Sequence, residues 1–311
     1  MDVLSTLFQQ RQHLIKTKYY GVRFSGDWAY SMTSSNAIYF YLVQAGSCCI
    51  SIGGATRKMY AGDIVMIANG DKHVCYALDY CGDDAEPLNR ISLNCNQGVI
   101  TVSEESTLNV QLILVECQYD KDPLLPLLSA LPPILPENND MPENQLKALD
   151  VAVSFITLES ECGRLGKLAM INLWVNIVMI ECLRTYIEGL PETSNNWLVA
   201  MREPYLSKAL FLMHDKPDHN WTTHELAKKA GMSRSGFSQR FKETVGIPPL
   251  TYLTDYRLRL AAGHLRLGKN NIGQISEMVG YASNSTFSQA FKRVYGMSPK
   301  EYQKQQVATS V

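Results

Sequence analysis

The sequence predicts an α+β protein, in which an N-terminal β-barrel and a helical segment precede an all-α domain with two helix-turn-helix units. A duplication predicts the second part, because residues 233–252 and 283–302 are identical at ten of twenty positions with a constant offset of 50. Short apolar runs separated by glycine turns predict the barrel between residues 38 and 117. Charge separates the two parts: residues 200–311 hold 16 Lys and Arg against 8 Asp and Glu, whereas residues 1–199 hold 13 against 22.

The division of charge indicates where nucleic acid binds. The whole chain has a formal net charge of −1, which by itself predicts no charged partner. The part from residue 200 onward carries +8 and the remainder carries −9. A basic domain joined to an acidic one is typical of proteins that contact nucleic acid through one domain, so we expect double-stranded DNA as the partner of residues 200–311.

Strands are expected throughout the first domain, residues 1–119. β-Branched and aromatic residues concentrate in six runs, which are separated by turn signals such as Gly53-Gly54 and Asn69-Gly70. Many short strands at this spacing are typical of a sandwich or barrel. The predicted strands are residues 38–44, 48–52, 63–67, 74–77, 90–93 and 110–115.

A proline-rich connector followed by helices is expected over residues 120–190. Apolar residues at helical spacing predict helices at 145–158 and 165–187, and the second is apolar on nearly every side. We therefore expect it to pack under the barrel and against either its own core or a second subunit, as a homodimer. Residues 191–199 form a polar linker before the domain at 200–311. The candidate dimer face consists of Leu168, Ile171, Trp174, Val175, Val178 and Leu183.

Neither a secretory signal nor a membrane span is expected. The first residues carry Asp2 and lack a long apolar core, and the apolar stretch 168–183 is interrupted by polar residues and shorter than the ~18–20 residues of a span. We expect a cytoplasmic protein with no membrane partner. The eight cysteines form no CxxC pair and no zinc-ligand spacing, so we expect thiols, no metal and no other cofactor.

The first helix-turn-helix unit begins at residue 222. Thr222 and Glu225 have the spacing of a capping box and predict the start of a helix, which Gly231 then ends. The next helix carries Phe237 and Phe241 four residues apart, so both face the preceding helix. Its opposite face is small and polar, as a helix that enters the major groove requires.

The second unit repeats this pattern. Asn271 begins its first helix, Gly280 turns the chain with one residue more than the first unit uses, and Ser283 caps the second helix. Two phenylalanines recur at the same spacing. A helix over residues 250–267 connects the units and is expected to place the two outward faces in successive major grooves.

On these residues the chain resembles the DNA-binding domain of the AraC/XylS family of bacterial transcription regulators, over residues 202–305. The resemblance implies that the second helix of each unit contacts DNA. The matching positions are Leu226-Ala227, Gly231-Met232-Ser233, Phe241-Lys242, Gly246, Pro249, Tyr252, Arg257, Ala261, Gly280-Tyr281, Ser283, Phe287, Phe291-Lys292-Arg293, Gly296, Ser298-Pro299 and Tyr302.

The resemblance also implies which side chains contact bases and phosphates. Gln239 and Gln289 occupy positions that are often Arg in the family, and because Gln pairs with adenine and Arg with guanine, we predict a bias toward A·T pairs. Arg257 resembles a structural arginine of the family, for which we expect a buried ion pair. The candidate DNA contacts are Arg234, Ser235, Ser238, Gln239, Lys242, Asn284, Ser285, Thr286, Ser288, Gln289, Lys292 and Arg293.

Residues 61–73 resemble the second motif of cupins, with turn glycines and the following His73. Many AraC/XylS regulators carry such a barrel as an effector-binding domain. A catalytic cupin needs further histidines and a glutamate, but residues 39–52 hold no His, so we expect no metal site and no enzyme. We expect His73 to anchor its loop or to line a ligand pocket. A cupin enzyme fused to a DNA-binding domain is the alternative.

Two effector hypotheses remain open beside a DNA-binding protein that has no effector. In the first, a small organic molecule enters the barrel between Tyr39, Tyr41, Met66 and Tyr76. In the second, thiols sense an oxidant, because the chain resembles cupin-containing regulators, some of which respond to reactive chlorine or other oxidants. Inert buried thiols are the structural alternative. The candidate redox cysteines are Cys48, Cys49, Cys75, Cys81 and Cys95.

Overall fold

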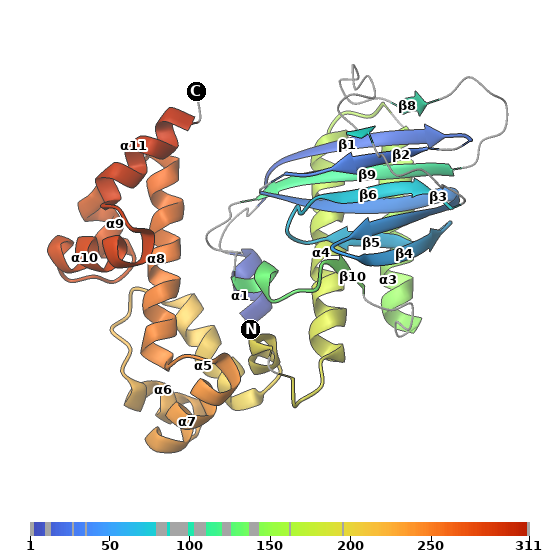
Figure 1. Cartoon of the computed structure of the whole chain (residues 1–311). Helices are drawn as coiled ribbons and strands as arrows, with labels where there is room; N and C mark the ends of the chain where they lie inside the picture. The colour runs from blue at the N-terminus through green and yellow to red at the C-terminus, as the bar shows by residue number, and fades with distance from the viewer. Residues whose placement is uncertain are drawn as a thin grey trace. The chain divides into compact units, whose positions relative to one another are not determined.

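The computed structural model describes residues 3–9, 14–26, 28–34, 36–78, 86–87, 99–102, 110–119, 126–136, 143–161, 163–194 and 196–309. The chain divides into two compact units (Figure 1). The barrel unit comprises Leu14–Tyr119 and Leu131–Gly189, and the helical unit comprises Met1–His13, Asp120–Ala130 and Leu190–Val311. The connector predicted at residues 120–190 is therefore shared between the two units.

The barrel unit is a mainly antiparallel sheet, in agreement with the short strands that the sequence predicts. The described strands join in the order β7-β2-β6-β3-β9-β1-β8, while β4 and β5 also pair with β3, and β10 pairs with β5. The strands are β1 (Leu14–Phe24), β2 (Ala29–Met32), β3 (Ala37–Ile52), β4 (Ala55–Tyr60), β5 (Ile64–Ile67), β6 (His73–Ala77), β7 (Glu86–Pro87), β8 (Val99–Val102), β9 (Val110–Tyr119) and β10 (Ile134–Leu135).

Strand β3 corrects one prediction. The sequence predicts two strands, 38–44 and 48–52, with a turn at Gly46, but β3 is continuous through this position. The register against β9 shifts between Val43 and Ala45, and Gly46 has a φ of 79°. A glycine with positive φ beside an extra residue makes a β-bulge, which here bends the strand. Beyond the bulge, β3 exchanges its partners β5 and β9 for β4 and β6.

The remaining strand predictions are confirmed in part. The runs predicted at 63–67, 74–77 and 110–115 overlap β5, β6 and β9. Strands β1, β2 and β4 were not predicted, because polar residues interrupt their apolar pattern. The strand predicted at 90–93 lies outside the described residues.

The interior of the barrel unit is aromatic. Tyr39, Tyr41 and Val43 alternate along β3 and belong to one buried cluster, together with Trp28, whose ring stacks on Phe24 at 4.0 Å. The intervening residues of β3 are buried as well. Because successive strand residues point to opposite faces, the sheet is covered on both sides. In Figure 1, helix α4 (Lys167–Gly189) passes behind the sheet, and Lys167 Nζ lies 5.0 Å from the ring centre of Tyr19 on β1.

Helix α3 (Glu143–Glu161) pairs with α4, and their rings Phe155 and Trp174 stack at 4.3 Å. Helix α4 is long and apolar enough to cross a membrane by length and composition alone, a test that a buried core helix also passes. Four residues of the predicted dimer face, Ile171, Val175, Val178 and Leu183, are buried in their own chain. These four residues therefore pack in the core of their own chain and not against a second subunit.

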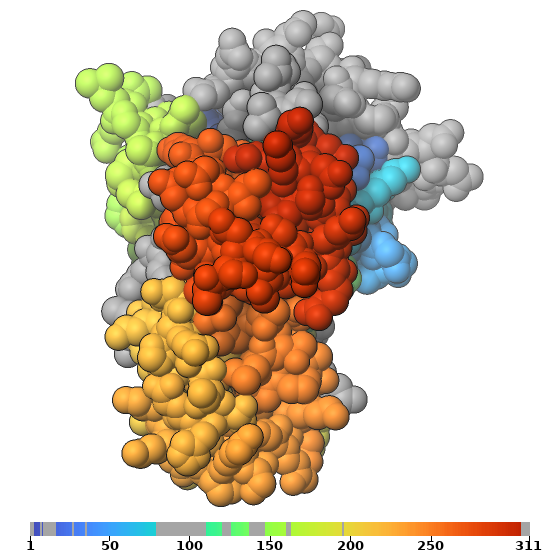
Figure 2. Space-filling model, turned by 90° about the vertical axis from the view of Figure 1, so that its left-hand side faces the viewer, coloured from blue at the N-terminus to red at the C-terminus, as the bar shows by residue number. Residues whose placement is uncertain are grey.

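The helical unit carries the duplication. Its described helices are α1 (Val3–Gln9), η2 (Trp197–Met201), α5 (Pro204–Asp215), α6 (Thr223–Ala230), α7 (Arg234–Val245), α8 (Pro249–Leu267), α9 (Ile272–Met278), α10 (Asn284–Tyr295) and α11 (Pro299–Thr309). One apolar cluster joins α1, α5, α6 and α7, and a second joins α8, α9, α10 and α11. On the face shown in Figure 2, residues 200–250 and 260–305 form two lobes.

Candidate nucleic-acid interface

The first helix-turn-helix unit is α6 and α7. The hydroxyl of Thr222 accepts a hydrogen bond from the backbone N–H of Glu225 at 3.1 Å. In a full capping box the Glu225 side chain would also accept from the backbone N–H of Thr222. Here the Glu225 carboxylate lies 3.1 Å from His219 Nε2 instead. Gly231 ends α6 with a φ of 81°, a conformation that favours glycine, and Ser233 Oγ accepts from the backbone of α7.

The buried face of α7 fixes its orientation. Phe237 and Phe241 are fully buried, and Phe241 meets the ring of Tyr252 on α8 edge-on at 5.8 Å. The opposite face therefore points to solvent, with Ser238 half-buried at its edge. Its exposed candidate DNA contacts are Arg234, Ser235, Gln239 and Lys242.

The second unit, α9 and α10, repeats the arrangement with a more complete cap on its first helix. Asn271 and Gln274 form a complete, reciprocal capping box, as the sequence predicts. Ser283 Oγ accepts from the backbone N–H of Thr286 at 3.2 Å and starts α10. Phe287 and Phe291 are fully buried. The outward face of α10 thus repeats that of α7.

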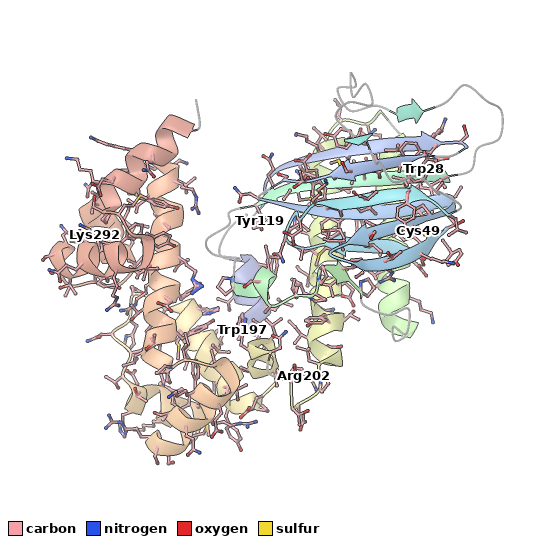
Figure 3. The ribbon with its side chains drawn as sticks, viewed as in Figure 1. Trp28, Cys49, Tyr119, Trp197, Arg202 and Lys292 are labelled. Atoms are coloured by element: carbon pink, nitrogen blue, oxygen red, sulfur yellow. The ribbon has the colours of Figure 1, made fainter. Side chains whose placement is uncertain are left out.

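Every candidate DNA contact on α10 is accessible. Ser288 is half-buried, and Lys292 lies on the outer side of the helix (Figure 3). This accessibility is what direct contact with base edges and phosphates requires. The exposed set is Asn284, Ser285, Thr286, Gln289, Lys292 and Arg293.

The two outward faces differ in charge. On α7, Gln239 Nε2 donates to Glu243 Oε1 at 2.9 Å, and Arg240 is bound to the carboxylate of Glu203. The duplicated positions on α10 are Ala290 and Arg293. Therefore α10 has a basic residue where α7 has an acidic one.

Arg257 departs from its expected role. Its guanidinium donates to two backbone carbonyls, from Nε to Pro217 O at 2.6 Å and from Nη2 to His219 O at 2.8 Å. No ion pair of Arg257 with a carboxylate is recorded among the described residues. Burial lowers the pKa of this guanidinium, although nearby Tyr281 and Asp218 oppose that shift. Arg257 is a structural residue, as expected, but through carbonyls and not through an ion pair.

In the barrel unit, His73 is buried and held from both sides. Its Nδ1 lies 2.7 Å from Asp71 O and its Nε2 lies 2.6 Å from Tyr41 Oη. A carbonyl can only accept, so Nδ1 carries the proton and Nε2 accepts from the tyrosine hydroxyl. Burial lowers the pKa of His73, which favours this neutral form. His73 thereby ties its loop to β3, one of its two expected roles.

Of the four predicted pocket residues, two face the interior. Tyr39 and Tyr41 lie in the buried aromatic cluster. Met66 pairs with Phe40, and Tyr76 pairs with Cys49, so both point to the other face of the sheet. The prediction was wrong for Met66 and Tyr76, because the register that fixes their direction depends on partner strands.

The described cysteines are buried thiols. Cys48, Cys49 and Cys75 are at most 4% exposed, and burial raises the pKa of Cys49 and Cys75. Cys81 and Cys95 lie outside the described residues. Within the described part of the chain, no group of three or more His, Cys, Asp or Glu side chains could hold a metal ion.

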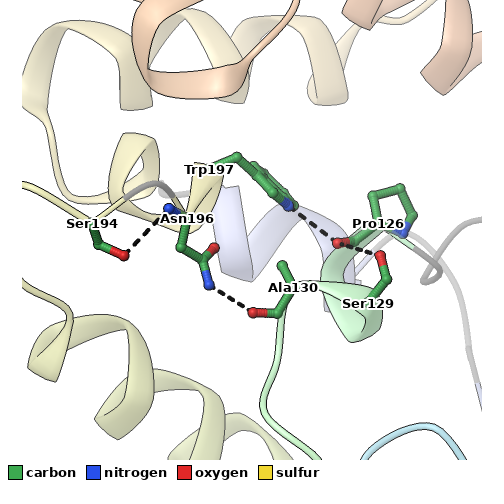
Figure 4. A pocket seen from close by; sticks show the side chains of 6 residues that line it. All are labelled: Pro126, Ser129, Ala130, Ser194, Asn196 and Trp197. Atoms are coloured by element: carbon green, nitrogen blue, oxygen red, sulfur yellow. Dashed lines mark hydrogen bonds between the residues drawn. The ribbon is translucent and has the colours of Figure 1, made fainter.

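Sequence reasoning missed a recess within the helical unit. Residues 126–130 lie against η2, where Trp197 Nε1 donates to Pro126 O at 3.1 Å and Asn196 Nδ2 donates to Ala130 O at 2.6 Å (Figure 4). These groups border an open pocket with a volume of about 470 Å³. Trp197 also lies 6.2 Å from the ring of Tyr252. The available signal was a tryptophan in a segment that otherwise has the composition of a polar linker.

Comparisons with known proteins agree with this geometry. A family described as a helix-turn-helix domain matches residues 226–305, and a cupin family matches residues 2–188. The chain is 34% identical to the HTH-type transcriptional regulator AlkR of Acinetobacter baylyi, over 98% of this chain and 100% of that protein. It is 31% identical to a putative AraC-like transcription regulator of Streptomyces antibioticus, over 97% of each chain. The RCS-specific HTH-type transcriptional activator RclR of Escherichia coli is 34% identical over 56% of this chain and 61% of that protein.

Proposed function

The chain belongs to the AraC-type family of helix-turn-helix transcription regulators with an N-terminal cupin domain, and we propose that it regulates transcription by inserting α7 and α10 into the major groove of double-stranded DNA at two neighbouring segments. The observation that carries the proposal is the pair of capped helices, each anchored by two buried phenylalanines and each exposing a small polar face. The basic charge of residues 200–311 supports it.

Selection of DNA ligands from a random pool by the purified full chain tests this proposal. We expect an enriched sequence with two segments about 10 base pairs apart, bound with an affinity that falls steeply as salt rises. A chain that selects no sequence, or whose binding is indifferent to salt, would refute it. The double variant Lys292→Ala/Arg293→Ala should bind every sequence more weakly.

For the effector we favour a small uncharged molecule over an oxidant. The aromatic cluster of the barrel consists of apolar and aromatic side chains, with the Glu116–Lys18 ion pair next to Tyr39, and Trp28 Nε1 is buried without a hydrogen-bond partner among the described residues. A bound molecule with an acceptor would satisfy that N–H. The thiols of Cys49 and Cys75 argue against oxidant sensing, because their raised pKa values leave little thiolate to react, and Cys48 is fully buried.

Two measurements separate these effectors. Thiol labelling of the native protein at neutral pH should be slow at Cys48, Cys49 and Cys75, and hypochlorite should leave DNA affinity unchanged while these thiols stay intact. A screen of uncharged apolar compounds should find one that raises the melting temperature and changes DNA affinity. Rapid labelling with a parallel change in DNA affinity would favour the oxidant.

A signal from the barrel has a covalent route to the DNA-binding helices. Strand β9 ends at Tyr119, and residues 126–130 follow and hold Trp197, which lies beside Tyr252. We propose that an effector acts through this segment. Trp197→Phe removes the N–H but keeps a ring, so it should weaken the effector response and leave the affinity without effector within about twofold. Arg164→Gln, at an exposed site, is the control.

We further propose that a second copy covers an apolar stripe of α3 and α4. The stripe surrounds the Phe155–Trp174 stack and carries no charged side chain, which suits a like surface better than an acidic or basic partner. Sedimentation velocity tests the proposal: Leu173→Asp should give monomers at micromolar concentration, whereas Lys147→Asp should not. A monomeric wild type would refute it. The exposed members are Val151, Phe155, Leu158, Met170, Leu173 and Ile177.

We propose no enzymatic activity for the barrel. The one described histidine in its interior, His73, already makes two hydrogen bonds, and burial favours its neutral form. Turnover of a candidate effector by the purified protein would contradict this.

A further inference from the structure

Three separate elements of the helical unit meet at one point. The loop between α5 and α6, residues 216–222, leads directly into the first helix-turn-helix unit. The turn between α9 and α10, residues 279–283, belongs to the second. Helix α8 runs between the units and carries Arg257 in its middle. The contact of residues 217–219, Arg257 and Gly280 is called here the Arg257 contact.

Arg257 holds the first unit by main-chain atoms. Its Nε and Nη2 donate to Pro217 O and His219 O, at 2.6 and 2.8 Å. A guanidinium presents several N–H groups in a rigid fork, so two bonds fix both the position and the direction of the loop. Lysine has a single rotatable ammonium group and cannot reproduce this geometry.

Gly280 brings the second unit against the same loop. A Cβ at this position would lie 2.6 Å from Asp218 O, 2.7 Å from Asp218 Cα and 2.9 Å from Arg257 Nη2. Its φ of 81° also favours glycine over any other residue. Glycine therefore permits direct contact between the backbones of the two units, at the site where Arg257 binds.

The recognition helices are thus connected twice, through α8 and through the Arg257 contact. A single connecting helix would leave each unit able to swivel about one end of it. A second contact away from those ends removes that freedom. Since recognition of two groove segments requires a fixed separation and a fixed rotation about the duplex axis, this contact bears directly on the choice of DNA site.

We infer that the Arg257 contact is a positioning site that sets the spacing and rotational phase between α7 and α10, and so makes the protein selective for the distance between its two DNA segments. This inference rests on the proposed function. Arg257 itself contacts no DNA in this role. Its contribution appears only when both recognition helices bind one duplex.

The test varies the DNA as well as the protein. The selected duplex is compared with one carrying five additional base pairs between its two segments, about half a helical turn, and with one that keeps a single segment. Dissociation constants are measured by fluorescence anisotropy at fixed salt with the full chain. For the wild type we expect the insertion to weaken binding by about 100-fold, because the second segment turns to the opposite side of the duplex.

Arg257→Lys and Gly280→Ala should each bind the original duplex about tenfold more weakly and lose most of the insertion penalty, to about threefold. Their affinity for the single-segment duplex should match that of the wild type. Arg266→Lys is the matched control, since Arg266 also lies on α8 but donates to Tyr302 Oη on α11 at 2.8 Å. It should keep the full penalty.

If Arg257→Lys keeps the insertion penalty of the wild type, the inference is overturned. It is also overturned if this variant loses as much affinity for the single-segment duplex as for the original duplex, because that loss indicates local damage. A wild type that binds specifically but tolerates the insertion overturns it and leaves the proposed function standing. Spin labels introduced as unnatural amino acids at Arg234 and Asn284 supply a test without DNA. A narrow distance distribution in the wild type should broaden in Arg257→Lys, and equal widths would refute the inference.

Discussion

The two helix-turn-helix units share an apolar framework and differ in the polar groups around it. Phe241 meets Tyr252 edge-on at 5.8 Å, and the duplicated pair Phe291 and Tyr302 does so at 5.4 Å. The tyrosine hydroxyls find different partners, because Tyr252 Oη lies 2.8 Å from the buried His214, whereas Tyr302 Oη accepts from Arg266 at 2.8 Å. The duplication has kept the anchors that fix each helix and the lysine pair Lys242 and Lys292, while the other charged and titratable positions have diverged.

The divergence extends to the outward faces. Glu243 on α7 accepts from Gln239, and the duplicated position on α10 is Arg293. Since phosphates attract cations and repel carboxylates, we expect the last turn of α10 to supply more of the affinity than the last turn of α7, whereas in the first turn Arg234 of α7 corresponds to the neutral Asn284 of α10. The predictions below test this asymmetry.

The largest effect is expected from reversing the charge of α10. Arg293→Glu removes a cation from the phosphate side and adds an anion, so affinity should fall about 100-fold for every sequence. The slope of log affinity against log salt concentration should become shallower by about 2. The same reversal at Lys208, exposed on α5, is the control and should have little effect. Anisotropy titrations at several salt concentrations measure both quantities. Equal losses at the two positions would contradict the assignment of α10 as the basic contact.

The buried His214 on α5, which packs on Tyr252 of α8, should make the helical unit acid-sensitive. Burial between Tyr252 and Tyr256 lowers the pKa of His214 to about 3. The imidazole of His214 takes up a proton near pH 6.5 in the unfolded chain but not in the native chain. Its contribution to the free energy of unfolding is therefore constant above that pH and falls as pH drops from about 6.5 toward 3. At pH 5 the loss should be about 2 kcal/mol.

Calorimetric unfolding of the full chain at pH 7.5 and pH 5 checks this prediction. His214→Leu lacks the group, so its stability should change less between the two pH values than that of the wild type, whatever the substitution costs by itself. The comparison of slopes also cancels other titrating groups, including His73, whose pKa burial lowers as well. Parallel slopes in the two proteins would show that His214 does not titrate in this way.

The duplicated framework could be predicted because its signals are local. A cap, a positive-φ glycine and a pair of aromatic residues four apart each act within one turn of helix, as Ser233, Gly231 and Phe237 do. The family resemblance added the assignment of the outward faces. The matching capping pattern at Thr222 failed in its return half, because His219, six residues away in sequence, binds the Glu225 carboxylate.

What could not be predicted depends on contacts distant in sequence. The bulge at Gly46 arises where β3 changes partners, so the glycine alone could not distinguish it from a turn. Arg257 was expected to bind a carboxylate, yet its partners are main-chain carbonyls forty residues away, and a backbone group leaves no mark in a sequence. Trp197 was assigned to a linker, since its partner Pro126 lies 71 residues earlier.

A smaller effect should distinguish the duplicated glutamines. Gln289 shares its turn with Arg293, whereas the amide N–H of Gln239 is engaged by Glu243. Gln289→Ala should therefore cost roughly 1–2 kcal/mol at one A·T position, and Gln239→Ala should cost less than about 1 kcal/mol. Affinities for duplexes with single base-pair changes measure both. If both variants lose the same base discrimination, the asymmetry between α7 and α10 is contradicted. If neither variant loses base discrimination, the predicted bias toward A·T pairs is wrong.

The smallest effect concerns Glu243, whose carboxylate both repels phosphate and holds Gln239. Two substitutions separate these roles. Glu243→Gln keeps an acceptor but loses the charge, so it should raise affinity two- to threefold for all sequences, about 0.5 kcal/mol. Glu243→Ala also releases the Gln239 amide, and should add discrimination for an A·T pair that Glu243→Gln lacks. If neither variant changes affinity at low salt, Glu243 lies away from the duplex, and the weaker role of α7 must have another cause.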